Sequence, residues 1–183
     1  MQDRSDEELM AAYANGDMAA FEGLYRRHRG PLYRFILRQV GDAATANDLY
    51  QGSWEKIIAA RRNYRPSAPL RAWMYRIARN HVIDHFRRTR PAVELEPERL
   101  EAPNPGPEQE LAGRQDAERL QAALEALPPE QKEVLLLKLE AGLDLASIAE
   151  ITGVGPETAK SRLRYAVARL KSVLAVSTAG EAP

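Results

Sequence analysis

Residues 145–165 read LASIAEITGVGPETAKSRLRY, and the spacing of small and apolar residues in this segment predicts a helix-turn-helix. Such a unit needs a small residue where its two helices cross and a turn residue that tolerates positive φ. Ala149 and Gly153 meet these two needs, and Pro156 stands at the expected first position of the second helix. The residues expected on the buried side are Ile148, Val154, Ala159, Leu163, Ala166 and Leu170.

The outer side of the second helix is predicted to bind DNA. Hydroxyl groups and cations near a helix N-terminus can reach phosphates and base edges in a major groove. A helical hairpin with a merely solvated face is the alternative interpretation. The candidate residues are Glu157, Thr158, Lys160, Ser161, Arg162, Arg164 and Tyr165.

Residues 70–88, LRAWMYRIARNHVIDHFRR, carry a second signal for nucleic acid. Helical periodicity gives two apolar arcs, one containing Trp73 and His81 and the other containing Phe86, beside a basic face. Guanidinium groups next to an amide and an indole are typical of a protein that holds unpaired bases. Taken alone, Trp73 is more simply a core residue, the arginines a solvated face and His81 a packed side chain rather than a metal ligand. The candidate residues are Trp73, Arg76, Arg79, Asn80 and Arg87.

The charges are distributed unevenly, although the formal net charge is zero. Residues 61–90 contain nine arginines and a single acid, Asp84, whereas residues 91–119 contain eight acids and three bases. A local basic patch attracts phosphates whatever the total charge. The averaged value therefore does not argue against a nucleic-acid partner.

Helical patterns fill most of the chain, so the sequence predicts an all-α protein of two small helical domains. Residues 91–110 are rich in proline and acids and are predicted to be a flexible linker. The expected divisions are a domain at 1–90, the linker at 91–110, a domain at 111–176 and a disordered tail at 177–183. The expected helices span about 5–14, 18–40 with a kink at Pro31, 43–61, 70–90, 111–127 and 130–140, followed by two short ones flanking 153–155.

Several classes of protein are disfavoured by the composition. There is no run of 18 apolar residues to cross a membrane, and the acidic N-terminus is unlike a secretory signal, so a cytoplasmic location is expected. The absence of cysteine excludes disulfides and thiolate zinc sites. We find no phosphate-cradling glycine motif, metal cluster or nucleophile–base pair, and therefore expect no enzyme, metal, cofactor or small-molecule substrate.

The two DNA-binding signals, in this order and separated by a linker, resemble the sigma-70 family of RNA polymerase sigma factors, specifically its extracytoplasmic-function (ECF) members. Residues 72–88 resemble that family's minus-ten-reading helix, and residues 126–163 resemble its minus-thirty-five-reading domain. Residues 47–58, NDLYQGSWEKII, are similar to its polymerase-docking helix. The resemblance covers about 5–90 and 115–173.

The resemblance implies a bacterial, cytoplasmic, non-catalytic protein that binds core RNA polymerase and promoter DNA and is held by an anti-sigma factor. It implies that the loop Tyr64–Leu70 lines a pocket for a flipped base, and that the two groups of candidate residues above read the minus-ten and minus-thirty-five elements. The residues implied in docking to the clamp of the largest polymerase subunit are Asp48, Leu49, Gln51 and Trp54.

Three residues depart from the family's pattern. Gly52 replaces a usual acid, which removes a charge and should weaken its helix by up to about 1 kcal/mol relative to alanine. Ala159 replaces a larger β-branched residue, which predicts looser packing. Tyr165 stands where arginine is common, and a tyrosine cannot pair bidentately with guanine.

Two other classes of protein also fit the sequence. A conventional transcriptional regulator would bind duplex DNA alone, usually as a dimer across two half-sites. A helical adaptor or anti-sigma protein would bind a partner but not DNA, so reversing the charges of Lys160 and Arg164 would change nothing.

Overall fold

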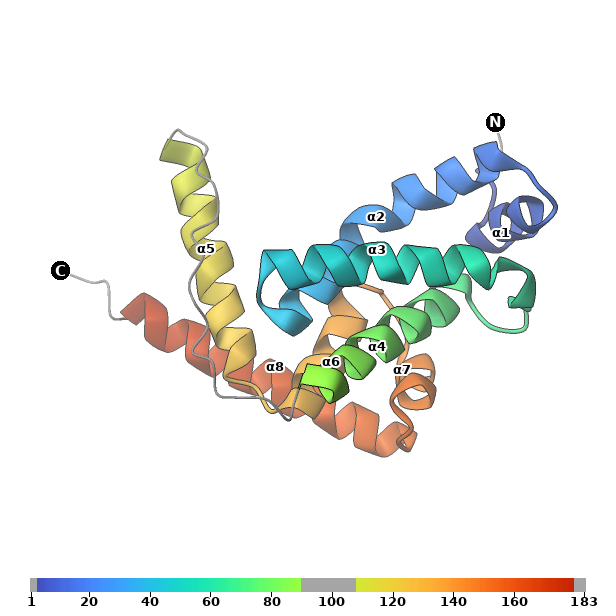
Figure 1. Ribbon diagram of the computed structural model, residues 1–183. Helices are drawn as coiled ribbons and strands as arrows, with labels where there is room; N and C mark the ends of the chain where they lie inside the picture. Colours follow the sequence, from blue (N-terminus) through green and yellow to red (C-terminus); the bar gives the residue numbers. More distant parts are fainter. Residues whose placement is uncertain (1–2, 90–107, 180–183) are drawn as a thin grey trace.

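A computed structural model of the chain describes residues 3–89 and 108–179, and those residues form helices and loops without a β-strand. The all-α prediction is therefore confirmed. Within these described residues, α-helices α1 to α4 belong to the first half and α5 to α8 to the second, as labelled in Figure 1. In chain order they are α1 (Asp6–Ala14), α2 (Met18–Val40), α3 (Ala43–Ala59), the short 3-10 helix η1 (Arg61–Asn63), α4 (Leu70–Thr89), α5 (Glu108–Glu125), α6 (Pro129–Leu139), α7 (Leu145–Thr152) and α8 (Pro156–Ala179).

Local capping chemistry fixes the first three helices. Ser5 and Glu8 form the reciprocal capping box that starts α1, and Asp17 and Asp42 each accept a first-turn N–H at α2 and α3. Gly41, at φ 87°, ends α2 in the left-handed conformation that glycine adopts without strain. α2 continues as one helix through Pro31.

The first half packs α2, α3 and α4 around a core of fully buried large side chains. Polar contacts of Asp6 join α1 to α2. His28 Nε2 lies 2.8 Å from one carboxylate oxygen of Asp6, and Arg27 donates to the other carboxylate oxygen at 2.9 Å. The contact with His28, aided by Arg27, holds the pKa of Asp6 at about 2. The core residues include Leu24, Leu32, Phe35, Ile36, Met74 and Tyr75.

The second half differs from the expectation at both of its ends. α5 begins at Glu108, inside the segment expected to be linker, and α8 is a 24-residue helix where we expected a short one. Residues 177–179 belong to α8 rather than to a disordered tail. The reason is that no proline or glycine interrupts residues 157–179. The rest of the predicted linker and tail, residues 91–107 and 180–183, lies outside the described residues.

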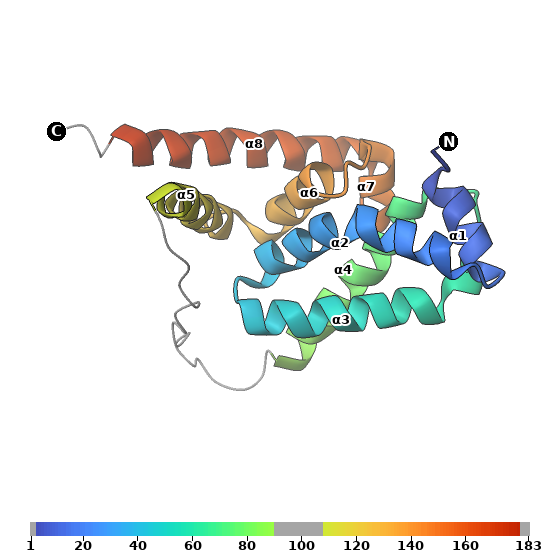
Figure 2. The same cartoon turned by 90° about the horizontal axis from the view of Figure 1, so that it is seen from above.

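The two halves pack against each other, an arrangement that the sequence did not predict. α6 contacts α2 and α7 contacts α4, and the buried apolar residues of both halves form one continuous cluster. In Figure 2, α6 and α7 lie between α8 and the helices of the first half. Leu136 and Leu137 of α6 are fully buried in this cluster.

In the part of the chain that the structure describes, the helices include neither a candidate membrane span nor a candidate metal site. Within residues 3–89 and 108–179, no helix is both long enough and apolar enough to cross a bilayer. The same residues contain no group of three or more His, Asp or Glu side chains placed to hold a metal ion.

Candidate nucleic-acid interface

The α7–α8 unit has the geometry of a helix-turn-helix. Asp144 caps α7 by accepting from the Ser147 N–H at 2.8 Å, and Gly153 ends the helix at φ 71°. The Val154 N–H then donates to the carbonyl of Ala149 at 3.1 Å, which turns the chain into α8. The turn predicted from Ala149 and Gly153 is confirmed.

α8 turns its small side chains inward and its polar side chains outward. Ala159 and Ala166 are fully buried against the rest of the second half, whereas Leu163 and Leu170 are half-buried at its edge. Ser161 and Arg162 are half-buried, and the guanidinium of Arg164 lies 5.2 Å from the centre of its neighbour's ring. The five candidates that are exposed are Glu157, Thr158, Lys160, Arg164 and Tyr165.

α4 presents Arg76, Asn80 and Arg87 on its exposed side. Trp73 is half-buried, and the centre of its ring lies 5.4 Å from that of Tyr64. Part of this side chain therefore packs inward and part stays exposed. Phe86, which the helical period places on an apolar arc of α4, is 41% exposed near the end of the helix.

The loop before α4, Tyr64–Leu70, is held in one shape by two hydrogen bonds. The Tyr64 hydroxyl donates to the Ala68 carbonyl at 2.6 Å, and a Glu7 carboxylate of α1 accepts from the Leu70 N–H at 2.9 Å. The loop is thus closed on itself and anchored to α1, beside Trp73. Burial of Tyr64 raises the pKa of its hydroxyl, which stays a donor at neutral pH.

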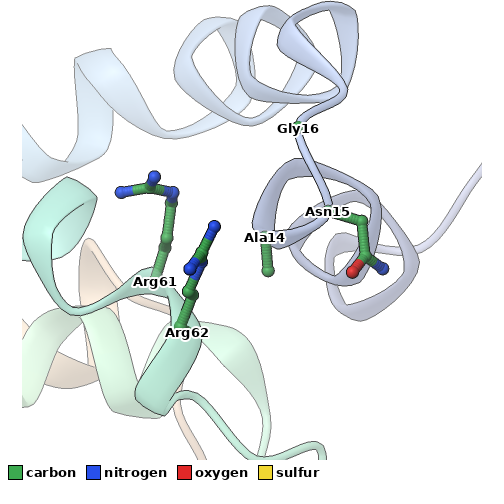
Figure 3. A pocket seen from close by; sticks show the side chains of 5 residues that line it. All are labelled: Ala14, Asn15, Gly16, Arg61 and Arg62. Carbon is green, nitrogen blue, oxygen red and sulfur yellow. The ribbon is translucent and has the colours of Figure 1, made fainter.

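A hollow of about 420 Å³ lies between η1 and the α1–α2 turn (Figure 3). Arg61 and Arg62 extend into it opposite Ala14, Asn15 and Gly16. A second hollow of about 230 Å³ shares both arginines and reaches the loop at Tyr64, Arg65 and Pro66. Neither arginine was predicted as a site residue from the sequence, although the excess of arginine over residues 61–90 pointed to both.

The two arginines are held differently. Arg61 donates to the Ile58 carbonyl at 2.8 Å and stacks over Tyr13 at 5.4 Å. Arg62 is exposed, and its guanidinium makes neither a hydrogen bond nor an ion pair with the residues that the structure describes. This leaves Arg62 free to bind an anion in the hollow.

The predicted docking helix, α3, exposes only part of its candidate set. Asp48 and Gln51 are exposed, but Leu49 and Trp54 are only 5% and 6% exposed because they face the core. Trp54 packs against Tyr25 and Tyr50, and its ring N–H is buried without a hydrogen-bond partner in the described residues. Leu49 and Trp54 therefore support the helix from within, and the docking role that the resemblance implies for the four residues stays a prediction.

Gly52 has a structural role that helix propensity does not predict. A Cβ at this position would lie 2.4 Å from Nε2 of His81 on α4, so the glycine makes room for the imidazole. The Nδ1 atom of His81 is buried without a hydrogen-bond partner among the described residues. Burial, with the nearby charges of Lys56 and Arg88, lowers the pKa of His81.

Two candidate arginines of α4 are bound by the second half of the chain. Arg76 donates to Glu150 of α7 at 3.0 Å, and Arg79 forms a close ion pair with Glu133 of α6. Asn80 and Arg87 make no such contact in the described structure and stay exposed.

Comparison with known proteins gives a consistent result. Residues 24–91 match the family described as Sigma-70 region 2, and residues 117–170 match Sigma-70, region 4. The ECF RNA polymerase sigma factor SigE of Mycolicibacterium smegmatis is 34% identical over 180 residues, covering 93% of this chain and 70% of the relative. The ECF RNA polymerase sigma factor SigM of Mycobacterium tuberculosis is 32% identical, covering 97% and 89%.

Solved structures show the same fold. CnrH in complex with the cytosolic domain of CnrY superposes with a TM-score of 0.72 at 24% identity, covering 94% of this chain and 99% of that one. The sigma factor RpoE in complex with the anti-sigma factor NepR, from Bartonella quintana, gives 0.69 at 24% identity, covering 85% and 97%.

Proposed function

Since the chain belongs to the sigma-70 family and to its ECF group, we propose that it binds core RNA polymerase and reads two separate elements of one promoter. The observation that carries the proposal is that one chain presents two helices with exposed cationic side chains, α4 beside an anchored loop and α8 after a helix-turn-helix. Neither helix needs to perform chemistry, because the polymerase catalyses nucleotide addition.

We propose that α8 reads the minus-thirty-five element as intact duplex. Its first turns expose a cation at Lys160, a cation at Arg164 and a hydroxyl at Thr158, which are suited to phosphates and base edges in a major groove. Glu157, Ser161, Arg162 and Tyr165 complete this surface. Because Tyr165 cannot make the bidentate contact of an arginine, the preferred sequence should differ there from promoters read by arginine.

We propose that α4 and the preceding loop hold the opened minus-ten strand. Asn80 offers an amide to a base, Arg87 a charge to a phosphate, and the exposed part of Trp73 a surface for stacking. Arg76 and Arg79 belong to the same surface once their carboxylate partners are displaced. The loop Tyr64–Leu70 is proposed to line a pocket for an extruded base, whose unstacking costs a few kcal/mol that binding must offset.

Arg61 and Arg62 extend this proposed path. The hollow that they line shares both arginines with a second one at the loop, so a strand held at the loop can continue into it. The side chains lining the first hollow include no acid, which suits a backbone phosphate.

The proposed protein partners are core polymerase and an anti-sigma factor. Asp48 and Gln51 are the exposed members of the candidate set on α3 and are proposed to meet the clamp of the largest subunit. Anti-sigma control is proposed because the related fold of RpoE was solved with its anti-sigma factor NepR. We place the protein in the bacterial cytoplasm, where the polymerase acts.

Run-off transcription with core polymerase on a genomic fragment library tests the proposal and yields the promoter. We expect defined start sites only when chain and core are both present. A gel shift on the recovered promoter, with and without core, then separates the alternatives. Tight, symmetric duplex binding by the chain alone would indicate a conventional regulator, and the absence of any association with core would reject the proposal.

A further inference from the structure

The first helix, α1, supplies a cap for α4, which begins far away in the sequence. Glu7 of α1 accepts a hydrogen bond at 2.9 Å from the N–H of Leu70, the first residue of α4, which is 63 positions away. The residue before α4 is Pro69, whose side chain offers no acceptor to the first N–H groups of the helix. A carboxylate is well suited to this end of a helix, because the helix dipole is positive there. Glu7 therefore serves α4 as the N-cap side chains of α1, α2 and α3 serve their own helices.

α1 can hold Glu7 in place because α1 is itself fixed on both sides of this residue. Asp6, the preceding residue, contacts two side chains of α2 at 2.8 and 2.9 Å. Leu9 and Met10, which follow, are buried in the core. A side chain carried by a rigid helix keeps its position, so the N–H of Leu70 meets a preformed acceptor.

The same carboxylate lies beside the loop that is proposed to take the extruded base. Glu7 lines the hollow of about 230 Å³ together with three residues of that loop. Burial raises the pKa of the Tyr64 hydroxyl most, and nearby carboxylates, Glu7 among them, raise it further. The loop Tyr64–Leu70 is thus held near one end by the bond from Tyr64 to Ala68 and at the other by Glu7.

Charge by itself would argue against an acid at this place. Among the described side chains that line the hollow, Glu7 is the one acid, whereas Arg61, Arg62 and Arg65 are cations. An acid repels the phosphates that these arginines attract. Electrostatics therefore predicts that removing Glu7 would strengthen the binding of a strand.

We propose that Glu7 is a positioning residue, which presets the loop Tyr64–Leu70 and the first turn of α4 for the extruded base. This inference rests on the proposed function of the loop. A loop that has to be ordered on binding lowers the affinity for its ligand, so a loop that is already ordered raises it. This gain exceeds the cost of the negative charge, and Glu7 acts through the loop rather than by touching DNA.

Variants of the full chain, assayed with core polymerase, separate positioning from charge. E7A removes the acceptor and the charge, E7Q keeps an amide oxygen as acceptor without the charge, and E22A removes an equal charge at an exposed position of α2. The probe is a fluorescent fork that carries the recovered promoter sequence. We expect E7A to bind it about fivefold more weakly than E22A, as for one lost capping bond, and E7Q to bind it at least as tightly as wild type.

Forks that each lack one base of the minus-ten strand assign this loss to the base pocket. The difference between E7A and E22A should vanish on the fork that lacks the extruded base and persist on the others. A difference that persists on every fork would mean that Glu7 supports the fold in general. Equal binding by E7A and E22A, or tighter binding by both E7A and E7Q, would mean that no positioning occurs. Each of these results overturns the inference.

Amide exchange, measured by NMR on the isotope-labelled chain alone, tests the anchor without DNA or polymerase. The N–H of Leu70 should exchange at least about tenfold faster in E7A than in wild type and should stay protected in E7Q, while amides of α2 are unchanged. Unchanged exchange in E7A would overturn the inference. If the exchange responds as expected but every fork that lacks a base binds wild type as tightly as the intact fork, the anchor stands and the proposed base pocket fails.

Discussion

The two proposed DNA-facing helices differ in how ready they are to bind. α8 exposes Lys160 and Arg164 without carboxylate partners in the described structure, whereas α4 has Arg76 and Arg79 bound by acids of the other half. A surface for intact duplex can be presented fully formed, because B-form DNA has a regular groove. A surface that is proposed to hold opened strand is needed only once the DNA is melted, so the ion pairs of Arg76 and Arg79 do not contradict that proposal.

The largest expected effect comes from changing α8, whose exposed cations have no carboxylate partners in the described structure. The variant K160E/R164E should lower run-off transcription from the cognate promoter by about 100-fold or more, because two favourable contacts with phosphates or bases become repulsive. Binding to core polymerase should be unchanged, because the proposed docking surface lies on α3. R169E, an equal charge reversal at an exposed position further along α8, is the control.

An equal loss in R169E would indicate that overall charge, rather than the first turns of α8, determines binding. Unchanged transcription in K160E/R164E would favour the adaptor interpretation, in which the protein never contacts DNA.

The next effect concerns the side of α4 that packs against α3 and thereby positions the proposed DNA-binding face. Alanine at Gly52 improves helix propensity by up to about 1 kcal/mol, but its Cβ would meet His81 Nε2 at 2.4 Å. We expect G52A to lower the free energy of unfolding by about 1–2 kcal/mol, since overpacking outweighs propensity. Urea denaturation measures this change.

The matched test is the same substitution without the imidazole. In an H81A background, G52A should become neutral or stabilising, and a double-mutant cycle gives the coupling between the two positions. Additive effects of G52A and H81A would contradict the contact between α3 and α4.

These residues also show how much of the fold could be predicted from the sequence. Caps and turns are decided by neighbours a few positions apart, so the ends set by Ser5, Gly41 and Gly153 could be predicted. Gly52 and His81 are 29 positions apart and belong to different helices, so helix propensity alone did not predict the contact between them. Neither periodicity nor composition states which helix lies opposite another.

In the candidate site, too, local features could be predicted from the sequence and contacts between distant residues could not. On α8 the exposed face follows from a single helical period anchored by Ala159 and Ala166, and that face was predicted well. On α3, Leu49 and Trp54 match a family motif, but a match does not tell whether a side chain faces a partner or the core. The contacts of Arg76 and Arg79 with Glu150 and Glu133 join residues more than fifty positions apart, which local patterns do not encode.

A smaller effect is expected at Arg62 of η1. Its guanidinium, like the cations of α8 and unlike Arg76 and Arg79 of α4, has no carboxylate partner in the described structure. R62A should weaken binding of the opened strand by the polymerase complex a few-fold and lower the slope of log K against log salt by about 0.7, as expected for one lost phosphate contact on single-stranded DNA. Titration of a fluorescent promoter fork at several salt concentrations measures both. R169A is the control, and an unchanged slope in R62A would remove the hollow from the proposed strand path.

The smallest effect concerns pH, and it again depends on the inner side of α4. The folded pKa of His81 lies below its ordinary value, chiefly because the imidazole is buried, so protonation favours the unfolded chain. His81 should therefore cost no stability above about pH 6.5 and should destabilise the fold progressively as the pH falls below that value. The Tm of the full chain at about pH 7.5 and 5.5 measures the loss.

The variant H81Q isolates this contribution, because glutamine does not titrate. Asp6 acts in a different window: its folded pKa of about 2 lies below its ordinary value, so its stabilising contact persists above about pH 4 and is lost only as the pH falls toward 2. Between pH 7.5 and 5.5 the wild-type chain should thus lose more Tm than H81Q. An equal loss in the two proteins would mean that His81 is hydrated in solution, and the close contact with Gly52 that positions α4 would then have to be abandoned.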